Sequence, residues 1–219
     1  MHLFYDGSLP WHLGQRWGLR APAAMLAQES PFNLAQTTTD SVAALLEDGL
    51  DRLISPDLLS LATASDGTSR PLNLSYQFDF NHERGALFTG DGYAGLIARY
   101  ARRLSSFGRW LAGAPCVLLH YTERNGDLGR LARAVAAASP HGNYILVILD
   151  VWSGPRATLL EHPRVRHIRM DLPWPDYQWF RPDHWDDQRG IAFERSLQRA
   201  VLAAASQLAG QLPPYPAVA

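Results

Sequence analysis

The sequence reads CVLLHY at residues 116–121, DLGRLARAVAAA at 127–138 and YILVILDV at 144–151. The two outer runs are almost entirely apolar, which is typical of strands that are buried on both faces. The alanine-rich run between them has the apolar spacing of a helix. A further apolar run, Val165 to Met170, comes later in the chain. This strand, helix, strand order predicts an α/β fold with parallel strands covered by helices.

The other segments extend the prediction to one domain. An opening strand is expected at His2 to Tyr5, and short β pieces between Leu58 and Phe88, such as Leu72 to Phe80 and Ala86 to Thr89. Helices are expected at Trp11 to Arg20, from Thr37–Asp40 to Leu50, and at Gly95 to Leu111, Asp127 to Ala138 and Arg189 to Leu212. The predicted fold is a three-layer, mainly parallel sheet of the flavodoxin-like or Rossmann-like type, with helices on both faces and a small irregular β insertion. It spans residues 1–212, with a proline-rich tail at 213–219.

Composition excludes several classes of protein. The chain has 219 residues, with 20 basic and 21 acidic side chains, so a protein that mainly binds nucleic acid is not expected. No apolar run reaches the roughly 18 residues that cross a bilayer, so we expect no membrane partner. Cys116, the single cysteine, cannot form an internal disulfide, which favours a cytoplasmic location, and no metal or cofactor motif occurs.

In a parallel sheet, ligands bind at the carboxyl ends of the strands, near a reversal of strand order. Asp6-Gly7-Ser8 directly follows the opening strand and precedes a helix with Pro10 in its first turn. Ser8 is therefore a candidate nucleophile, with backbone amides from Gly7 onward to hold an oxyanion. The alternative is that the Ser8 hydroxyl only caps the helix.

Two further groups of residues could carry chemistry. His82, next to Glu83, is a candidate general base, and the alternative is an exposed loop histidine. Between Leu172 and Asp187 the chain concentrates aromatic and acidic residues that could bind a ligand or form a packed lid. The candidates there are Trp174, Trp179 and Trp185 for stacking, and Asp183 and His184 for acid–base chemistry.

Four other residues are assigned from their positions. Arg102 and Arg103 either bind an anionic substrate or pair with acids, and at most one of them faces a pocket because they are adjacent on a helix. His120 and His167 are expected to be half-buried strand residues rather than metal ligands, since no metal-binding spacing occurs.

Several short motifs follow one another along the chain. They are Ser30-Pro31-Phe32-Asn33, Phe80-Asn81-His82-Glu83, Tyr100-Ala101-Arg102-Arg103-Leu104 with Phe107, the strands around Val117–His120 and Ile145–Leu149, and the stretch ending in Asp183–Trp185. Their order resembles a bacterial family catalogued as papain-like cysteine peptidases, which reads Pro-Phe-Asp-Trp, Phe-x-His-Asp and Tyr-x-Arg-Arg-Ile at the first three. The likeness runs from about Phe4 to Asp187.

The family opens with Ser-Leu-Gly-x-x-Cys, whose cysteine is assigned as the nucleophile. Here the region reads Tyr5-Asp6-Gly7-Ser8-Leu9-Pro10, so Gly7 matches the motif glycine and the cysteine is missing. The resemblance implies peptide, acyl or ester chemistry in which Ser8 replaces the thiol. The alternative implication is a site that has lost covalent chemistry and only binds a ligand.

These observations lead to one hypothesis and one rival. The hypothesis is a hydrolase-like or acyltransferase-like protein in which Ser8 attacks a small-molecule, glycan or peptide substrate and His82 takes its proton. Glu83 completes that site, with Asp183, His184 and the tryptophan-rich loop at its edge. The rival is a non-catalytic binding or accessory protein descended from such an enzyme.

Overall fold

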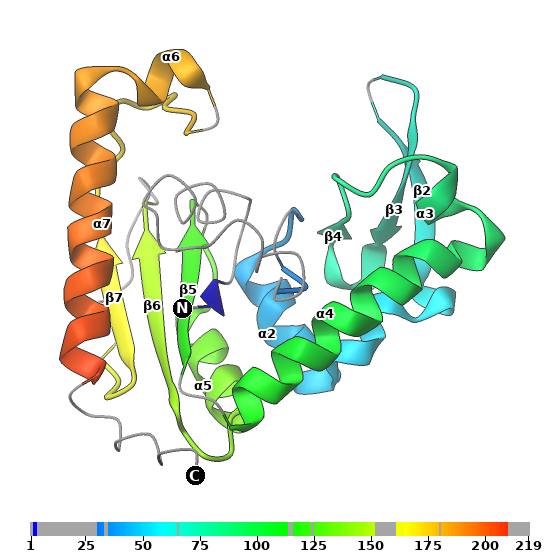
Figure 1. Cartoon of the computed structure of the whole chain (residues 1–219), viewed down its shortest axis with the longest axis horizontal. Helices are drawn as coiled ribbons and strands as arrows, with labels where there is room; N and C mark the ends of the chain where they lie inside the picture. The colour runs from blue at the N-terminus through cyan, green and yellow to red at the C-terminus, as the bar shows by residue number, and fades with distance from the viewer. Residues whose placement is uncertain are drawn as a thin grey trace, which may run out of the picture.

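The structure is a computed structural model of the whole chain (Figure 1). It describes residues 2–3, 30–32, 35–64, 66–113, 116–123, 125–151, 161–179 and 181–209. Gly7, Ser8, the expected helix at Trp11 to Arg20 and the proline-rich tail lie outside these residues. The side chain of Trp185 also lies outside the description.

A parallel sheet of four strands forms one half of the molecule. The strands are β1 (His2–Leu3), β5 (Cys116–Thr122), β6 (Tyr144–Asp150) and β7 (Val165–Arg169), and they stand in that order. All neighbouring pairs are parallel. The predicted α/β class with parallel strands is confirmed. The expected reversal of strand order does not occur among the described strands, because they follow one another across the sheet in chain order.

Helices cover the two faces of this sheet. Successive side chains of a strand point to opposite faces, so Leu118 and Leu146 belong to one buried cluster, whereas Leu119 and Val147 belong to another. The first face is packed by α2 (Thr39–Asp48) and α5 (Leu128–Ala138). The second is packed by the long C-terminal helix α7 (Gln188–Ala209), which stands beside β7 and β6 in Figure 1.

A small antiparallel sheet forms the other side of the molecule. It contains β2 (Leu59–Thr63), β3 (Ser69–Asn73) and β4 (Phe78–Asp79) in chain order. The predicted small β insertion is confirmed, but two details were wrong. Leu74–Tyr76 forms a 3₁₀ turn that interrupts the expected β piece, and Ala86–Thr89 forms helix α3. This helix follows Gly85 at φ 81° and buries Phe88 while Leu87 faces outward, so the segment packs through one side chain rather than through alternate ones.

The long helix α4 (Ala94–Ala112) follows α3 and confirms the helix predicted at Gly95 to Leu111. The remaining short elements are the 3₁₀ turns Leu50–Ile54, Pro56–Leu58 and Asp91–Tyr93, and the one-turn helix α6 (Pro182–Trp185).

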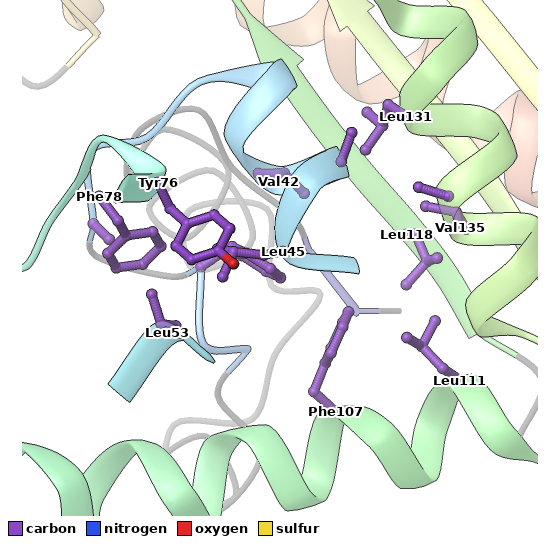
Figure 2. Packing of buried hydrophobic residues seen from close by; sticks show 14 of the residues in the cluster. Val42, Leu45, Leu53, Tyr76, Phe78, Phe107, Leu111, Leu118, Leu131 and Val135 are labelled. Atoms are coloured by element: carbon purple, nitrogen blue, oxygen red, sulfur yellow. The ribbon is translucent and has the colours of Figure 1, made fainter. Parts of the chain in front are cut away.

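One hydrophobic core joins the two sheets. Figure 2 shows Tyr76 and Phe78 of the antiparallel side, Val42 and Leu45 of α2, and Leu118 of β5 within a single cluster. The ring of Phe107 from α4 lies edge-on to Phe32, with the ring centres 5.6 Å apart. Because α2 lies inside this core, its position relative to the parallel sheet is fixed by packing on both sides.

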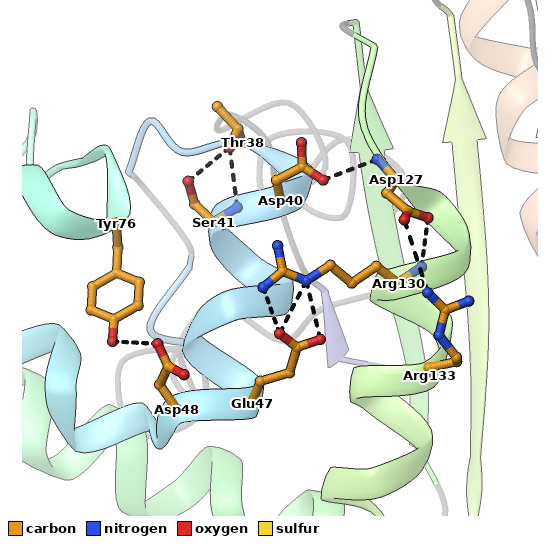
Figure 3. Close-up of polar contacts among 9 residues, drawn as sticks. All are labelled: Thr38, Asp40, Ser41, Glu47, Asp48, Tyr76, Asp127, Arg130 and Arg133. Atoms are coloured by element: carbon orange, nitrogen blue, oxygen red, sulfur yellow. Dashed lines mark hydrogen bonds and ion pairs between the residues drawn. The ribbon is translucent and has the colours of Figure 1, made fainter.

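Polar contacts hold α2 in register with its neighbours (Figure 3). The hydroxyl of Thr38 accepts a hydrogen bond from the Ser41 N–H and so caps the helix. The Asp40 carboxylate accepts the N–H of Asp127, which itself caps α5. At the other end of α2, Tyr76 donates to Asp48 over 2.9 Å. The first turn of α2 is therefore fixed beside the carboxyl ends of the parallel strands.

The close packing of α3 on α4 gives a matched pair of substitutions. A Cβ atom at Gly95 would lie 2.0 Å from the Leu87 carbonyl oxygen, whereas a Cβ at Gly108 meets nothing within 4 Å. We expect Gly95→Ala to lower the free energy of unfolding by about 1–3 kcal/mol through overpacking. Gly108→Ala should raise it by about 0.5–1 kcal/mol because alanine is the better helix former. Urea denaturation of both variants measures the difference, and equal midpoints would contradict the contact.

Candidate functional site

Six polar residues gather at the carboxyl edge of the parallel sheet, on the face packed by α2 and α5. Alternation along each strand places five of them on this face, since His120 and Thr122 follow buried Leu118, and Asp150 follows buried Leu146 and Ile148. We call the set the carboxyl-edge cluster: Thr39, His120, Thr122, Asp150, His167 and Arg169. Such polar groups at the ends of buried parallel strands mark the position where α/β proteins bind ligands.

Asp150 and His167 form the central pair of the cluster. The Asp150 Oδ2 atom lies 3.1 Å from Nε2 of His167 and 3.2 Å from Nε of Arg169. The His167 side chain is 1% exposed and that of Asp150 is 7% exposed. Burial lowers the pKa of His167, and the hydrogen bond that His167 donates to Asp150 opposes this effect. The imidazole is therefore neutral near pH 7, and it is oriented by the Asp150 carboxylate, which also accepts a hydrogen bond from Arg169.

His120 forms a second group with two threonines. Its Nε2 atom lies 3.0 Å from the Thr39 hydroxyl, which donates to the Thr122 hydroxyl over 3.5 Å. The residue is fully buried, and burial lowers the pKa of His120 to about 4. Its other ring nitrogen, Nδ1, has no hydrogen-bond partner in the part of the chain that the structure describes.

The loop after β5 brings Thr39 to this group. A Cβ atom at Gly126 would lie 2.7 Å from the Thr39 Cβ, so only glycine permits this close approach of the loop to α2. The neighbouring Asp127 then donates its N–H to Asp40. The first turn of α2 is thus held against the carboxyl end of β5 by contacts of its side chains with the backbone of Gly126 and Asp127.

The predicted pair His82 and Glu83 does not form a base with its orienting acid. His82 is exposed on the turn after β4, whereas Glu83 is 1% exposed. The Glu83 carboxylate accepts hydrogen bonds from Arg99 at 2.5 Å and from Arg103 at 3.3 Å, both on α4. The alternative that an arginine pairs with an acid therefore holds for Arg103, while Arg102 is exposed.

The tryptophan-rich segment packs on itself. Trp174 lies edge-on to Tyr177 and His184, and the Arg189 guanidinium lies 4.6 Å from the centre of the Trp174 ring. Trp179 packs against the α7 side of the core. These contacts favour the packed lid over an open stacking platform.

The acid–base candidates of that segment also make local contacts. Asp183 is exposed and pairs with Arg181, whose hydrogen bond lowers the pKa of Asp183. The His184 Nδ1 atom accepts the N–H of Gln178. In Figure 1 the α6 region and the antiparallel sheet lie at opposite sides of the molecule, so Asp183 and His184 do not share a site with His82 and Glu83. The expected gathering of these four residues is wrong because each pair belongs to a different packing unit.

The sequence placed His120 and His167 correctly on strands, but His120 is fully buried rather than half-buried, and neither residue was assigned to a site. The signal that could have found them is the appearance of polar residues at the carboxyl ends of otherwise apolar strands. Thr122, Asp150 and Arg169 stand there in one row across β5, β6 and β7.

Comparisons with known proteins identify no family for this chain. No family model matches the chain, and neither curated proteins nor solved structures give a match. Within the described ranges, no cluster of three or more histidine, cysteine or acidic residues could hold a metal ion. No described helix has both the length and the apolar character needed to cross a membrane.

The burial of His120 predicts a loss of stability in mild acid. The unfolded chain binds a proton near pH 6.5, whereas the folded chain keeps His120 neutral down to about pH 4. The free energy of unfolding should therefore fall by up to about 3 kcal/mol as the pH drops through this window. Urea denaturation from pH 7 to pH 4 measures the effect, and the loss should be smaller in His120→Gln, which cannot titrate. Identical pH profiles would contradict the neutral, buried state.

Cys116 should behave as an inert thiol. It is buried in β5, and burial raises its pKa to about 11. We expect its reaction with Ellman's reagent at pH 8 to be at least about 100-fold slower in the native protein than in 6 M guanidinium, because the thiolate is the reacting form. Fast labelling of the folded chain would show instead that the β5 strand opens.

Proposed function

We propose that the protein is a hydrolase-like or acyltransferase-like enzyme that works at the carboxyl-edge cluster. The observation that carries this proposal is the buried contact of 3.1 Å between Asp150 and His167 at the ends of β6 and β7. A histidine oriented by a carboxylate is the usual proton acceptor for an O–H nucleophile near neutral pH.

The geometry assigns a role to each member of the pair. Asp150 accepts the Nε2 proton of His167, which leaves the basic lone pair on Nδ1 of the neutral ring. His167 takes the proton of an attacking hydroxyl as the new bond to the substrate carbonyl carbon forms. It gives this proton to the leaving group when the bond between the carbonyl carbon and that group breaks. Arg169 also donates to Asp150 Oδ2 and so helps to hold the carboxylate in position.

Ser8 is the proposed source of the attacking hydroxyl. The strand β1 runs parallel to β5, so its carboxyl end lies at the same edge of the sheet as the cluster. The motif order that resembles papain-like cysteine peptidases supports acyl chemistry, with Ser8 in place of the missing thiol and Gly7 in the motif turn. We include in the proposal a flavodoxin-like layering, a cytoplasmic location and a small-molecule, glycan or peptide substrate.

A non-catalytic binding protein is the second candidate. It is favoured by the contacts of Glu83 and Asp183, because both predicted acids are occupied by neighbouring arginines. On this proposal the carboxyl-edge cluster binds a ligand without transferring an acyl group.

Turnover of a series of p-nitrophenyl esters of increasing acyl length tests the enzyme proposal. His167→Asn and Asp150→Asn should each lower kcat/KM by about 10²- to 10⁴-fold, the usual contribution of a general base. His141→Asn, in an exposed loop, is the control and should leave kcat/KM unchanged. In the wild type, kcat/KM should fall with acid only below pH 6.5, because burial lowers the pKa of His167.

Three outcomes decide between the candidates. Loss of activity in Ser8→Ala together with His167→Asn supports the enzyme proposal. Loss in His82→Asn with full activity in His167→Asn would move the base to the antiparallel side and overturn the assignment. Absence of turnover in the wild type for every ester would favour the binding protein.

A further inference from the structure

We infer that His120, together with Thr39 and Thr122, forms a binding position for an O–H donor, with Nδ1 of His120 as the acceptor. The donor is either a water molecule or a hydroxyl group of the substrate. The inference deepens the proposed function by naming the polar group that the carboxyl-edge cluster selects, but its evidence is independent of the Asp150–His167 pair.

The first observation is that one buried ring nitrogen of His120 lacks a hydrogen-bond partner among the described residues. His120 is fully buried, and its Nε2 atom is bonded to Thr39. No described residue gives Nδ1 a hydrogen-bond partner. Buried polar atoms in proteins are nearly always hydrogen-bonded, and one that lacks a protein partner points to a bound water or ligand. The imidazole is held in place by Thr39, so Nδ1 has a fixed direction.

The second observation is the direction of the neighbouring hydrogen bonds. The Thr39 hydroxyl has one proton and donates it to Thr122. In this arrangement the Thr39 hydroxyl accepts from His120 over 3.0 Å, which places the ring proton on Nε2. A neutral imidazole carries one proton, so Nδ1 then has a lone pair and accepts. With this tautomer the partner of Nδ1 is a donor.

The need for a proton selects among ligands. A carboxylate or fully ionised phosphate has no proton to give to Nδ1. A neutral hydroxyl has one, which is why the site fits an alcohol or water rather than an anion.

His120 lies on the same face of the sheet as the Asp150–His167 pair. His120 pairs in register with Ile148, which pairs with His167, and all three stand on the α2 and α5 face. Two strand spacings separate the backbones of the histidines, which is about 10 Å. A hydroxyl held by His120 and an acyl group attacked near His167 can therefore belong to one small molecule or to two neighbouring ones.

Crystal structures of the wild type, His120→Asn and His120→Gln test the inference. The asparagine amide keeps an acceptor at the place of Nδ1 and loses the contact with Thr39. The glutamine amide keeps the contact with Thr39, since its longer chain reaches the place of Nε2, and it loses the acceptor at the place of Nδ1. We expect an ordered oxygen within about 2.7–3.2 Å of Nδ1 in the wild type and of the amide oxygen in His120→Asn, and no such oxygen in His120→Gln.

A second set of crystals soaked in glycerol separates the two sources. A glycerol hydroxyl that replaces the oxygen identifies a substrate hydroxyl position, whereas an unchanged oxygen identifies an enclosed water. Nitrogen-15 spectra of the wild-type histidine rings give an independent measurement, and the ring nitrogen of His120 without a proton should be Nδ1. A proton on Nδ1, or a wild-type crystal without an oxygen there, overturns the inference. Neither readout depends on ester turnover, so failure of the proposed function would be seen separately.

Discussion

The parallel pairing of β5 with β6 is the constraint from which the site follows. Both strands are buried along their length, so the polar residues at their carboxyl ends, Thr122 and Asp150, emerge side by side beneath the helices. Buried polar atoms need partners, and these come from α2 on one side and from β7 on the other. The location of the carboxyl-edge cluster is thus a consequence of strand direction. The chemistry of the cluster is set by the few side chains that give these buried polar atoms their hydrogen-bond partners.

Much of this architecture could be predicted from the sequence, because the signals are strong where burial is complete. The apolar runs at β5 and β6 and the periodic stripe of α4 each dictate one type of element. The antiparallel side was less predictable, since its strands are short and interrupted. Gln77 at φ 45° ends one turn and Gly85 begins the next helix, and such backbone changes leave little trace in an apolar pattern.

The site was harder to predict than the fold. Neighbours in sequence suggested the pairs His82 with Glu83 and Asp183 with His184, yet the carboxylates of both pairs bind arginines. The pair that does form, Asp150 with His167, joins residues 17 positions apart on two neighbouring strands and depends on the register of those strands. His120 meets Thr39 over 81 positions. Contacts of this kind are fixed by tertiary packing, which a single sequence without its fold does not reveal.

The Glu83 ion pairs have a mechanical consequence for the whole molecule. One buried carboxylate holds two arginines that stand one turn apart on α4, and Arg99 and Arg103 also lie over the rings of Phe88 and Tyr100. Separating the turn after β4 from α4 would leave a charge without compensation in the protein interior. The two ion pairs therefore anchor the turn after β4 to α4.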